Sequence, residues 1–373
     1  MEIVINRKEF LDGFVVGSSM AGKSKVLSIL DNVKIRVDSG RVYVTSNSIQ
    51  NCIVRRVGIE SNSADIVGYE FLVNPDDFIK ALKSLKDKTL SIELSSNTLT
   101  ILHGKGTIEI STLGAAEFPV MDKVGGGTPL YTYDIDSATL YRWLQMAKDF
   151  VSTDELRPQM CGMLMYVKDG EFGACATDTR VLFADSYTVD SDTQDMECIL
   201  PSASFNVLQM MINATESVSM QMDAKNLSFK TTDTRLTCQL LNGRFPNFKA
   251  VIPQGYELQT GFDKTALLDS VSRVGMFSDK SHSLIVLDIQ DGMSKLKGSD
   301  LTLGKSAIDT CECIHGGDDI TIGVSSEYFI RCINHISGDD IVMEMSNPAR
   351  PILFTDKNYP LLRIVVMPMN ISN

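Results

Sequence analysis

The sequence predicts an α+β protein made of three repeats of about 125 residues, each an antiparallel sheet with two helices packed on one face. Each third of the chain has the same order: an amphipathic stretch, a hairpin, a second amphipathic stretch and further alternating strands. One phenylalanine recurs at the same place in each second amphipathic stretch, as Phe78, Phe205 and Phe329. The expected domains are 1–127, 128–252 and 253–373.

The first element of each repeat is expected to be a helix. NRKEFLDGFVVGSSM, DSATLYRWLQMAKDFVS and DKTALLDSVSRVGMFS open the three repeats. In the second of them the apolar side chains follow the i, i+3, i+4, i+7 spacing of one helix face, with Leu140, Trp143, Leu144 and Ala147. Asp136 or Ser137 is a candidate N-cap for this helix, and Asp263 for the third one.

A β-hairpin is expected next. Val33, Ile35 and Val37 alternate with polar residues, which is the period of a half-buried strand, and the pattern resumes after the turn residue Gly40. The second and third repeats turn at 169–170 and 291–292, where each sequence reads Asp-Gly.

The second helix and the closing strands complete each repeat. NPDDFIKALKSL, PSASFNVLQMMI and SSEYFIRCINHI have Asn74, Ser202 and Ser325 at their starts, where an N-cap is wanted. Alternating strands follow, and the first two repeats end alike in Phe-Pro, at 118–119 and 245–246.

One short motif points to a different function. GSSMAGKS at 17–24 fits the phosphate-binding pattern G-x-x-x-x-G-K-[ST]. A working phosphate loop lies between a strand and the helix that follows it, so that the helix N-terminus faces the phosphates. This match follows an expected helix and precedes an expected strand, which is the reverse order. The order of elements therefore argues against a phosphate loop. An NTPase is kept as one alternative function, and ATP binding that is lost on Lys23→Ala would support it.

Composition excludes several classes of protein. The 373 residues are 43% hydrophobic and 22% charged, as in a globular protein, and no apolar run is long enough to span a bilayer. The start of the chain lacks the apolar region of a signal peptide, so we expect a cytoplasmic location. Eight cysteines without C-x-x-C and four histidines indicate neither a metal centre nor a cofactor, and no catalytic constellation stands out. The formal charge of −12 argues against binding of nucleic acid by bulk electrostatics.

Three such repeats, ending in VVMPMNI, resemble the β sliding clamp of bacterial DNA polymerase III. The resemblance covers the whole chain and rests on the order and spacing of RPQMCGML (157–164), ATDTRVLF (176–183), NGRFPNF (242–248), IGVSSEYF (322–329) and VVMPMNI (365–371). It implies a non-enzymatic processivity factor that closes head to tail as a homodimer ring around duplex DNA, without reading its sequence. It also implies tethering of the replicative polymerase, the clamp loader and repair proteins through linear peptide motifs.

The resemblance also implies three sets of site residues. The walls of the partner-peptide pocket would be Arg157, Met160, Thr177, Leu182, Pro246, Val251, Tyr328, Pro348, Val365, Val366, Met367, Pro368 and Met369. The cations that face DNA would be Lys23, Lys80, Lys83, Lys86, Arg142, Lys148, Arg273 and Arg331. The dimer contact would place Ile108 and Ile110, on an edge strand, against Met276 and Phe277.

A second alternative is a triplicated scaffold or binding module that never encircles DNA. The mass of the native particle separates it from the ring, because a ring needs about twice the 41.1 kDa of one chain.

Overall fold

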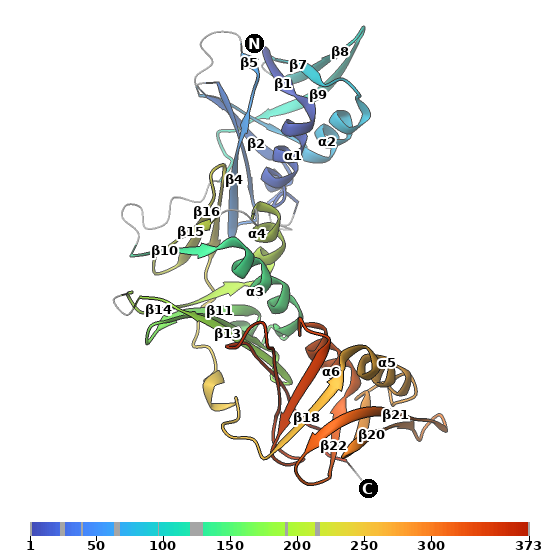
Figure 1. The fold of residues 1–373 in the computed structure, drawn as a ribbon. Helices are drawn as coiled ribbons and strands as arrows, with labels where there is room; N and C mark the ends of the chain where they lie inside the picture. The colour runs from blue at the N-terminus through green and yellow to red at the C-terminus, as the bar shows by residue number, and fades with distance from the viewer. Residues whose placement is uncertain are drawn as a thin grey trace. The chain divides into compact units, whose positions relative to one another are not determined.

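The computed structural model describes residues 2–22, 27–38, 40–62, 68–95, 97–119, 130–190, 193–212 and 217–371. The chain divides into two compact units. Unit 1 comprises Met1–Arg142 and Ala203–Leu240, and unit 2 comprises Trp143–Ser202 and Leu241–Asn373. Each unit holds one antiparallel sheet with helices against one of its faces (Figure 1).

The sheet of unit 1 has thirteen strands in the order β10-β15-β16-β17-β4-β3-β2-β6-β9-β8-β7-β1-β5. Their bounds are β1 (Glu2–Asn6), β2 (Val33–Asp38), β3 (Arg41–Asn47), β4 (Asn51–Gly58), β5 (Ser61–Asn62), β6 (Tyr69–Val73), β7 (Thr89–Leu94), β8 (Thr98–His103), β9 (Gly106–Gly114), β10 (Tyr131–Asp136), β15 (Ser217–Met222), β16 (Asn226–Lys230) and β17 (Thr234–Gln239). The helices are α1 (Arg7–Gly17), α2 (Pro75–Ser84) and α4 (Phe205–Met211), with the 3₁₀ turns η1 (Ser28–Asp31) and η4 (Ser202–Ser204), of which η4 begins in unit 2 and ends in unit 1.

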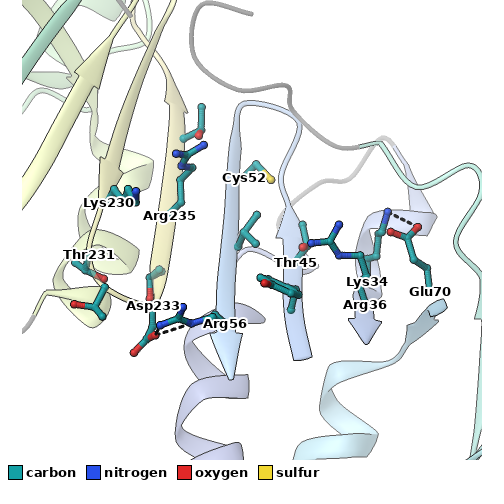
Figure 2. A pocket seen from close by; sticks show the side chains of 15 residues that line it. Lys34, Arg36, Thr45, Cys52, Arg56, Glu70, Lys230, Thr231, Asp233 and Arg235 are labelled. Carbon is teal, nitrogen blue, oxygen red and sulfur yellow. Dashed lines mark hydrogen bonds and ion pairs between the residues drawn. The ribbon is translucent and has the colours of Figure 1, made fainter. Parts of the chain in front are cut away.

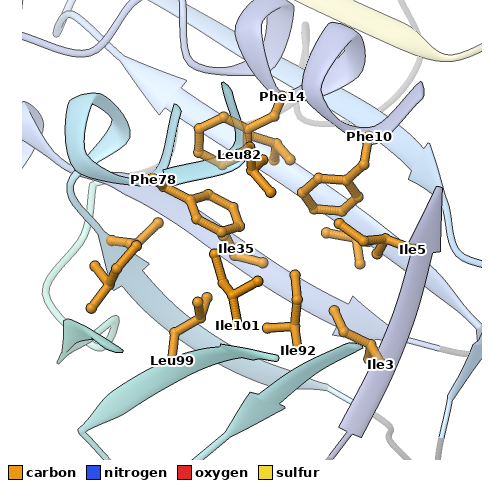
Figure 3. Close-up of a cluster of buried hydrophobic side chains, with 14 of the residues drawn as sticks. Ile3, Ile5, Phe10, Phe14, Ile35, Phe78, Leu82, Ile92, Leu99 and Ile101 are labelled. Atoms are coloured by element: carbon orange, nitrogen blue, oxygen red, sulfur yellow. The ribbon is translucent and has the colours of Figure 1, made fainter. Parts of the chain in front are cut away.

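The core of the first repeat forms between α1, α2 and the sheet. The rings of Phe10 and Phe14 lie 6.1 and 4.8 Å from that of Phe78 between centroids, both in edge-to-face geometry. Ile35 and Ile101 lie beneath them on the strands (Figure 3). Asn74 caps α2 through its side chain, which accepts from the Asp76 and Asp77 amides, as the sequence predicts. Burying this apolar face is what holds the two short helices on the sheet.

The sheet of unit 2 has twelve strands in the order β14-β11-β12-β13-β25-β24-β23-β18-β21-β20-β19-β22. Their bounds are β11 (Gly162–Lys168), β12 (Glu171–Thr177), β13 (Val181–Thr188), β14 (Met196–Pro201), β18 (Leu258–Asp263), β19 (Leu284–Gln290), β20 (Gly292–Asp300), β21 (Lys305–Gly316), β22 (Ile320–Ser325), β23 (Asp340–Met345), β24 (Ile352–Thr355) and β25 (Arg363–Val366). The helices are α5 (Lys264–Gly275), α6 (Ser326–Asn334) and the larger part of α3 (Ser137–Phe150), with 3₁₀ turns η3 (Pro158–Met160) and η5 (Phe248–Ala250).

The expected order of helix, hairpin, helix and strands is confirmed, with two corrections. A strand precedes the first helix of every repeat, as β1, β10 and β18, and the alternation of Tyr131, Tyr133 and Ile135 with polar residues in β10 was a visible signal. The three sheets are not separate, because β4 pairs with β17 of the next repeat and β13 pairs with β25. Joining the edges satisfies backbone groups that three separate sheets would leave unpaired.

The caps agree with the sequence in part. Asp136 accepts from the Thr139 amide at 2.8 Å and Asp263 from the Ala266 amide at 2.7 Å. Ser202 is not the cap of α4, because it belongs to η4 and the helix begins only after Ser204. Ser325 stands at the N-cap of α6 without a hydrogen bond from its side chain.

Candidate functional site

The last strand of the chain joins the middle and last repeats inside unit 2. β25 lies between β13 and β24, with Val365 opposite Leu182 on one side and opposite Leu353 on the other. The segment VVMPM therefore meets ATDTRVLF, although the two are far apart in the sequence. This meeting is the arrangement that the expected partner-peptide pocket requires.

A turn before β13 fixes the end of this strand pair. Thr177 donates from its hydroxyl to the Val181 carbonyl at 2.7 Å and accepts from the Thr179 amide at 3.0 Å. Asp178 accepts from the amides of Arg180 and Val181 at 2.8 and 2.9 Å. The closed turn presents the Arg180 carbonyl to the Met367 amide at 2.8 Å. The chain beyond β25 is thus bound to the middle repeat through its backbone.

The tail is bound to the last repeat as well. Met369 forms a bridge with Gly323, and its amide donates to the Gly323 carbonyl at 2.7 Å. A Cβ at position 323 would lie 2.6 Å from the Met369 carbonyl oxygen, so only glycine allows this approach. The sequence reasoning missed this contact, although a glycine inside a strand, as in IGVSSEYF, is a known sign of close backbone approach.

Helix α6 contacts the middle repeat through two basic side chains. The Arg331 guanidinium donates to the Asp149 carbonyl at 3.0 Å and pairs with Asp178 at 3.3 Å, and it also lies 5.0 Å from the ring centroid of Tyr328. His335 contacts the Asp149 carboxylate at 2.8 Å. Arg331 was expected to face DNA, but in this structure its charge is already paired within the protein.

Apolar side chains fill the face of the sheet where β13 and β25 meet. Leu182, Val365 and Leu353 belong to one buried cluster with Phe245 and Phe248 from the end of the middle repeat. The other expected wall residues differ in exposure. Met160, Thr177 and Val366 are buried, Tyr328, Met367, Pro368 and Met369 are half-buried, and Arg157, Pro246, Val251 and Pro348 are exposed. A ligand could therefore directly contact Met367, Pro368 and Met369 after β25 and the exposed wall residues. Leu182 and Val365 lie buried behind them.

The remaining expected DNA-facing cations differ in exposure and in the ion pairs that they form. Lys80, Lys83 and Lys86 are exposed on and just after α2, and Lys80 is 4.0 Å from Asp77. Lys148 is exposed and Arg142 is half-buried on α3. Arg273 pairs with Asp309 at 2.7 Å. Lys23 lies outside the described residues.

Two strands have two thirds of their length open along one edge. Residues 106–111 of β9 pair with β8 alone, because β6 pairs only with residues 112–114. Residues 305–312 of β21 likewise pair with β20 alone, because β18 pairs only with residues 313–316. Both statements hold for the strands that the structure describes.

The expected dimer residues lie beside these open edges. β9 is not an edge strand in the sheet order, which corrects the expectation, yet its open part, residues 106–111, carries both isoleucines. Ile110 is buried and Ile108 half-buried against the core of their own repeat. At the end of α5, Met276 is 73% and Phe277 42% exposed. Two large apolar side chains in water next to an open strand edge are typical of a surface that a partner covers.

The described part of the GSSMAGKS segment, residues 17–22, is a packed turn at the end of α1. α1 ends at Gly17, and the chain goes on through η1 into β2, so the order is helix and then strand. The Ser46 hydroxyl donates to the Gly17 carbonyl at 2.7 Å and accepts from the Met20 amide at 3.1 Å. A Cβ at position 17 would lie 2.7 Å from Val44. Gly17 therefore serves close packing against β3, and Lys23 and Ser24 lie outside the described residues.

None of the eight cysteines forms a disulfide bond, and seven of them are buried. Burial raises the pKa of the Cys198 and Cys238 thiols to about 12, which disfavours the thiolate that a metal needs. Within the described ranges no three His, Cys, Asp or Glu side chains are grouped to hold a metal ion. None of the described helices is both long and apolar enough to cross a membrane.

Comparison with known proteins agrees with this geometry along the whole chain. Three domain models of the DNA polymerase III beta subunit match in order: the N-terminal domain at residues 1–122, the central domain at 134–247 and the C-terminal domain at 249–370. The chain belongs to the DNA polymerase III beta subunit family. Its function is that of a DNA sliding clamp, a processivity factor of DNA replication. The boundaries at 127 and 252 stay predictions.

Relatives and solved structures are similar over their full length. The beta sliding clamp of Rickettsia bellii is 21% identical with complete coverage of both chains, and that of Streptococcus pneumoniae is 23% identical over 93% of each. A sliding clamp of Pseudomonas aeruginosa bound to griselimycin superposes with a TM-score of 0.93 at 21% identity, covering all of both chains. The beta subunit of Thermotoga maritima gives a TM-score of 0.90 at 20% identity, again with full coverage. These structures establish the three-domain clamp fold.

Proposed function

We propose that two copies of this chain join head to tail into a ring around duplex DNA, sealed where β9 of one copy meets β21 and the end of α5 of the other. The observation that carries the proposal is the pair of open strand edges on β9 and β21. An interface between two different surfaces repeats from one copy to the next and can close into a ring. Met276 and Phe277 supply the apolar part of the seal, with about 1.5–3 kcal/mol for each fully buried side chain.

The mass of the particle tests this proposal. Sedimentation equilibrium of the purified chain at micromolar concentration should give about twice 41.1 kDa. A monomer at that concentration would contradict the ring, and so would a series of open-ended oligomers.

The residues around β25 are proposed to hold the linear motifs of partner proteins. The support is the position of β25 between the middle and last repeats, with the half-buried Met367, Pro368 and Met369 beyond it and the exposed Val251 on the adjacent segment. Methionine side chains adapt to different ligands, which suits a site that serves several partners in turn. A sliding clamp of Pseudomonas aeruginosa with the same fold has been solved with griselimycin bound, so a relative of this chain takes up a ligand.

We also propose that the chain has no catalytic activity of its own and acts in the cytoplasm, on the replicating DNA. The support against an NTPase is the order of α1, η1 and β2 and the packing of Gly17, which place the start of the 17–24 motif at the C-terminal end of α1 and not at a helix N-terminus. The triplicated scaffold that does not encircle DNA is the remaining alternative, and the particle mass separates the two.

A further inference from the structure

A groove of about 470 Å³ lies on the sheet of unit 1, where β4 of the first repeat pairs with β17 of the middle repeat (Figure 2). Its walls come from β2, β3, β4, β6, β16 and β17 and from the turn at 231–233. On these strands the side chains that face the helices, such as Ile35, Val44 and Leu236, are fully or almost fully buried. The groove is formed by the alternate side chains, so it lies on the opposite face of the sheet.

The groove is basic although the chain as a whole is acidic. Five cations and two carboxylates line it, a balance of +3 in a chain whose formal charge is −12, namely Lys34, Arg36, Arg56, Lys230, Arg235, Glu70 and Asp233. Both carboxylates are already used, because Lys34 pairs with Glu70 at 2.7 Å and Arg56 pairs with Asp233. Within the described part of the chain Arg36, Lys230 and Arg235 form no ion pair.

Two of these cations stand directly opposite each other. Lys230 on β16 and Arg235 on β17 are cross-strand partners, so their side chains leave the sheet on the same face (Figure 2). Like charges in such a pair destabilise a sheet. A bound anion would remove that repulsion, and the pair thus marks the place where a negative group of a ligand would sit.

The row across the sheet gives the size of the ligand. Lys230, Arg235, Val54, Thr45 and Lys34 are successive cross-strand neighbours on five adjacent strands. Four strand spacings of about 4.8 Å span roughly 19 Å, which is the length of about six extended residues. The half-buried Val54 gives the middle of the row an apolar surface, and the hydroxyl of Thr45 can bond to a backbone.

The aromatic residue of the groove decides between a peptide and a nucleic acid. Single-stranded nucleic acids bind by stacking bases on open aromatic faces. Tyr43 is the aromatic side chain lining this groove, and the Arg36 guanidinium lies over its ring, 4.5 Å from the centroid. That ring face is occupied, whereas the cations remain available to carboxylates.

We propose that this groove binds an extended acidic segment of a partner protein, with one carboxylate between Lys230 and Arg235 and further carboxylates toward Arg36. The site shares no residue with the surface proposed for partner motifs in unit 2, and it does not depend on ring closure. A partner with an apolar motif and an acidic segment could therefore bind at both places, and two linked contacts raise the overall affinity.

The test is a titration of the full-length chain into a fluorescein-labelled peptide of about eight alternating Asp and Glu residues. Anisotropy should report saturable binding that weakens with salt, and a matched peptide of Asn and Gln should not bind. The double variant Lys230→Gln/Arg235→Gln should weaken binding roughly tenfold or more. The control Lys80→Gln/Lys83→Gln removes the same charge from the exposed side of α2, and its affinity should stay within about twofold.

Each other outcome overturns the proposal. Absence of binding, or an equal loss in both double variants, would leave only non-specific attraction. Binding of a short single-stranded DNA that needs Lys230 and Arg235, while the acidic peptide fails to compete, would assign the groove to nucleic acid. The melting temperature of the Lys230→Gln/Arg235→Gln variant shows whether it is folded. Because the two substitutions remove a repulsive pair, this melting temperature should equal or exceed that of the wild type. A clear fall would contradict the repulsion.

Discussion

At the residue scale, Gly17 separates the two interpretations of the 17–24 motif. We expect Gly17→Ala to lower the free energy of unfolding by about 1–3 kcal/mol, because the new Cβ would meet Val44 at 2.7 Å. The matched control is Gly58→Ala on β4, where no atom lies within 4 Å and stability should hardly change. Urea unfolding measures both, and millimolar ATP should not shift the wild-type midpoint. If ATP raised the urea midpoint of the wild type but not that of Lys23→Ala, the nucleotide interpretation would be restored.

Asp356 is a second residue whose chemistry gives a direct test. It is 4% exposed and holds the loop before β25. Its carboxylate accepts from the Ser337 amide at 2.6 Å, the Asn358 amide at 2.8 Å and the Ser337 hydroxyl at 3.0 Å. Burial acts to raise the pKa of this carboxyl, but these hydrogen bonds to the charged form outweigh burial and keep the pKa below its ordinary value.

We expect Asp356→Asn to cost about 1–3 kcal/mol of stability at neutral pH, because one buried acceptor is replaced by a donor. A lowered pKa in the folded state means that the carboxylate stabilises the fold above the unfolded pKa of about 4 and stops doing so as pH falls through the folded value. The difference between wild type and variant should therefore shrink below about pH 4. Urea unfolding over a pH series measures it, with the exposed Asp319→Asn as control. A difference that does not vary with pH would show that the charge is not what matters.

At the element scale, periodicity predicted which segments form helices and strands, but not how the repeats join. The alternation and the recurring phenylalanines depend on local burial, and Phe78, Phe205 and Phe329 are all buried under their helices. The pairings of β4 with β17 and β13 with β25 depend on contacts between distant parts of the chain, which no local pattern encodes. The same limit applies to the Arg331–Asp178 pair, since the spacing of cations on α6 says nothing about which carboxylate lies opposite.

The tail after β25 is the element whose removal tests the partner surface. We expect deletion of residues 367–373 to abolish binding of a fluorescent Gln-Leu-x-Leu-Phe peptide, because it removes the half-buried Met367 and Met369 and their bonds to Arg180 and Gly323. Deletion of 370–373 is the matched control, since it leaves both bonds in place and should keep most of the affinity. Sedimentation should show the same oligomeric state for the wild type and both truncated proteins. Unchanged peptide affinity in a folded protein lacking 367–373 would exclude the tail from the site.

At the scale of the whole molecule, ring closure depends on a small number of apolar side chains. We expect Phe277→Asp to give monomers at micromolar concentration, because a carboxylate placed in a buried interface has to be desolvated without a partner. Leu156→Asp is the control, as Leu156 is 91% exposed and lies outside the proposed seal. Sedimentation velocity distinguishes the species. An intact dimer of the Phe277 variant would show that the seal lies elsewhere.

A ring explains how a chain with a formal charge of −12 can remain on DNA. Proteins held by phosphate contacts lose affinity steeply as salt rises, because each contact depends on the release of counterions. A closed ring is held by its topology, so its residence does not depend on those contacts. The exposed Lys80, Lys83 and Lys86 would then guide the first encounter with DNA and would contribute little to retention.

The test follows from that difference between topological and electrostatic binding. The chain is loaded by its clamp loader onto a nicked circular DNA, and the DNA-bound fraction is isolated by gel filtration at rising salt. We expect retention on the circle at salt concentrations that remove phosphate-bound proteins, and release when a restriction enzyme linearises the same circle, because the ring slides off the new ends. Lys80→Gln/Lys83→Gln should slow loading, yet once loaded it should be retained as well as the wild type. Phe277→Asp should not be retained at all, since it cannot close. Equal salt-resistant retention on circular and linear DNA would exclude encirclement, because a protein that stays on a free end is held by contacts and not by topology.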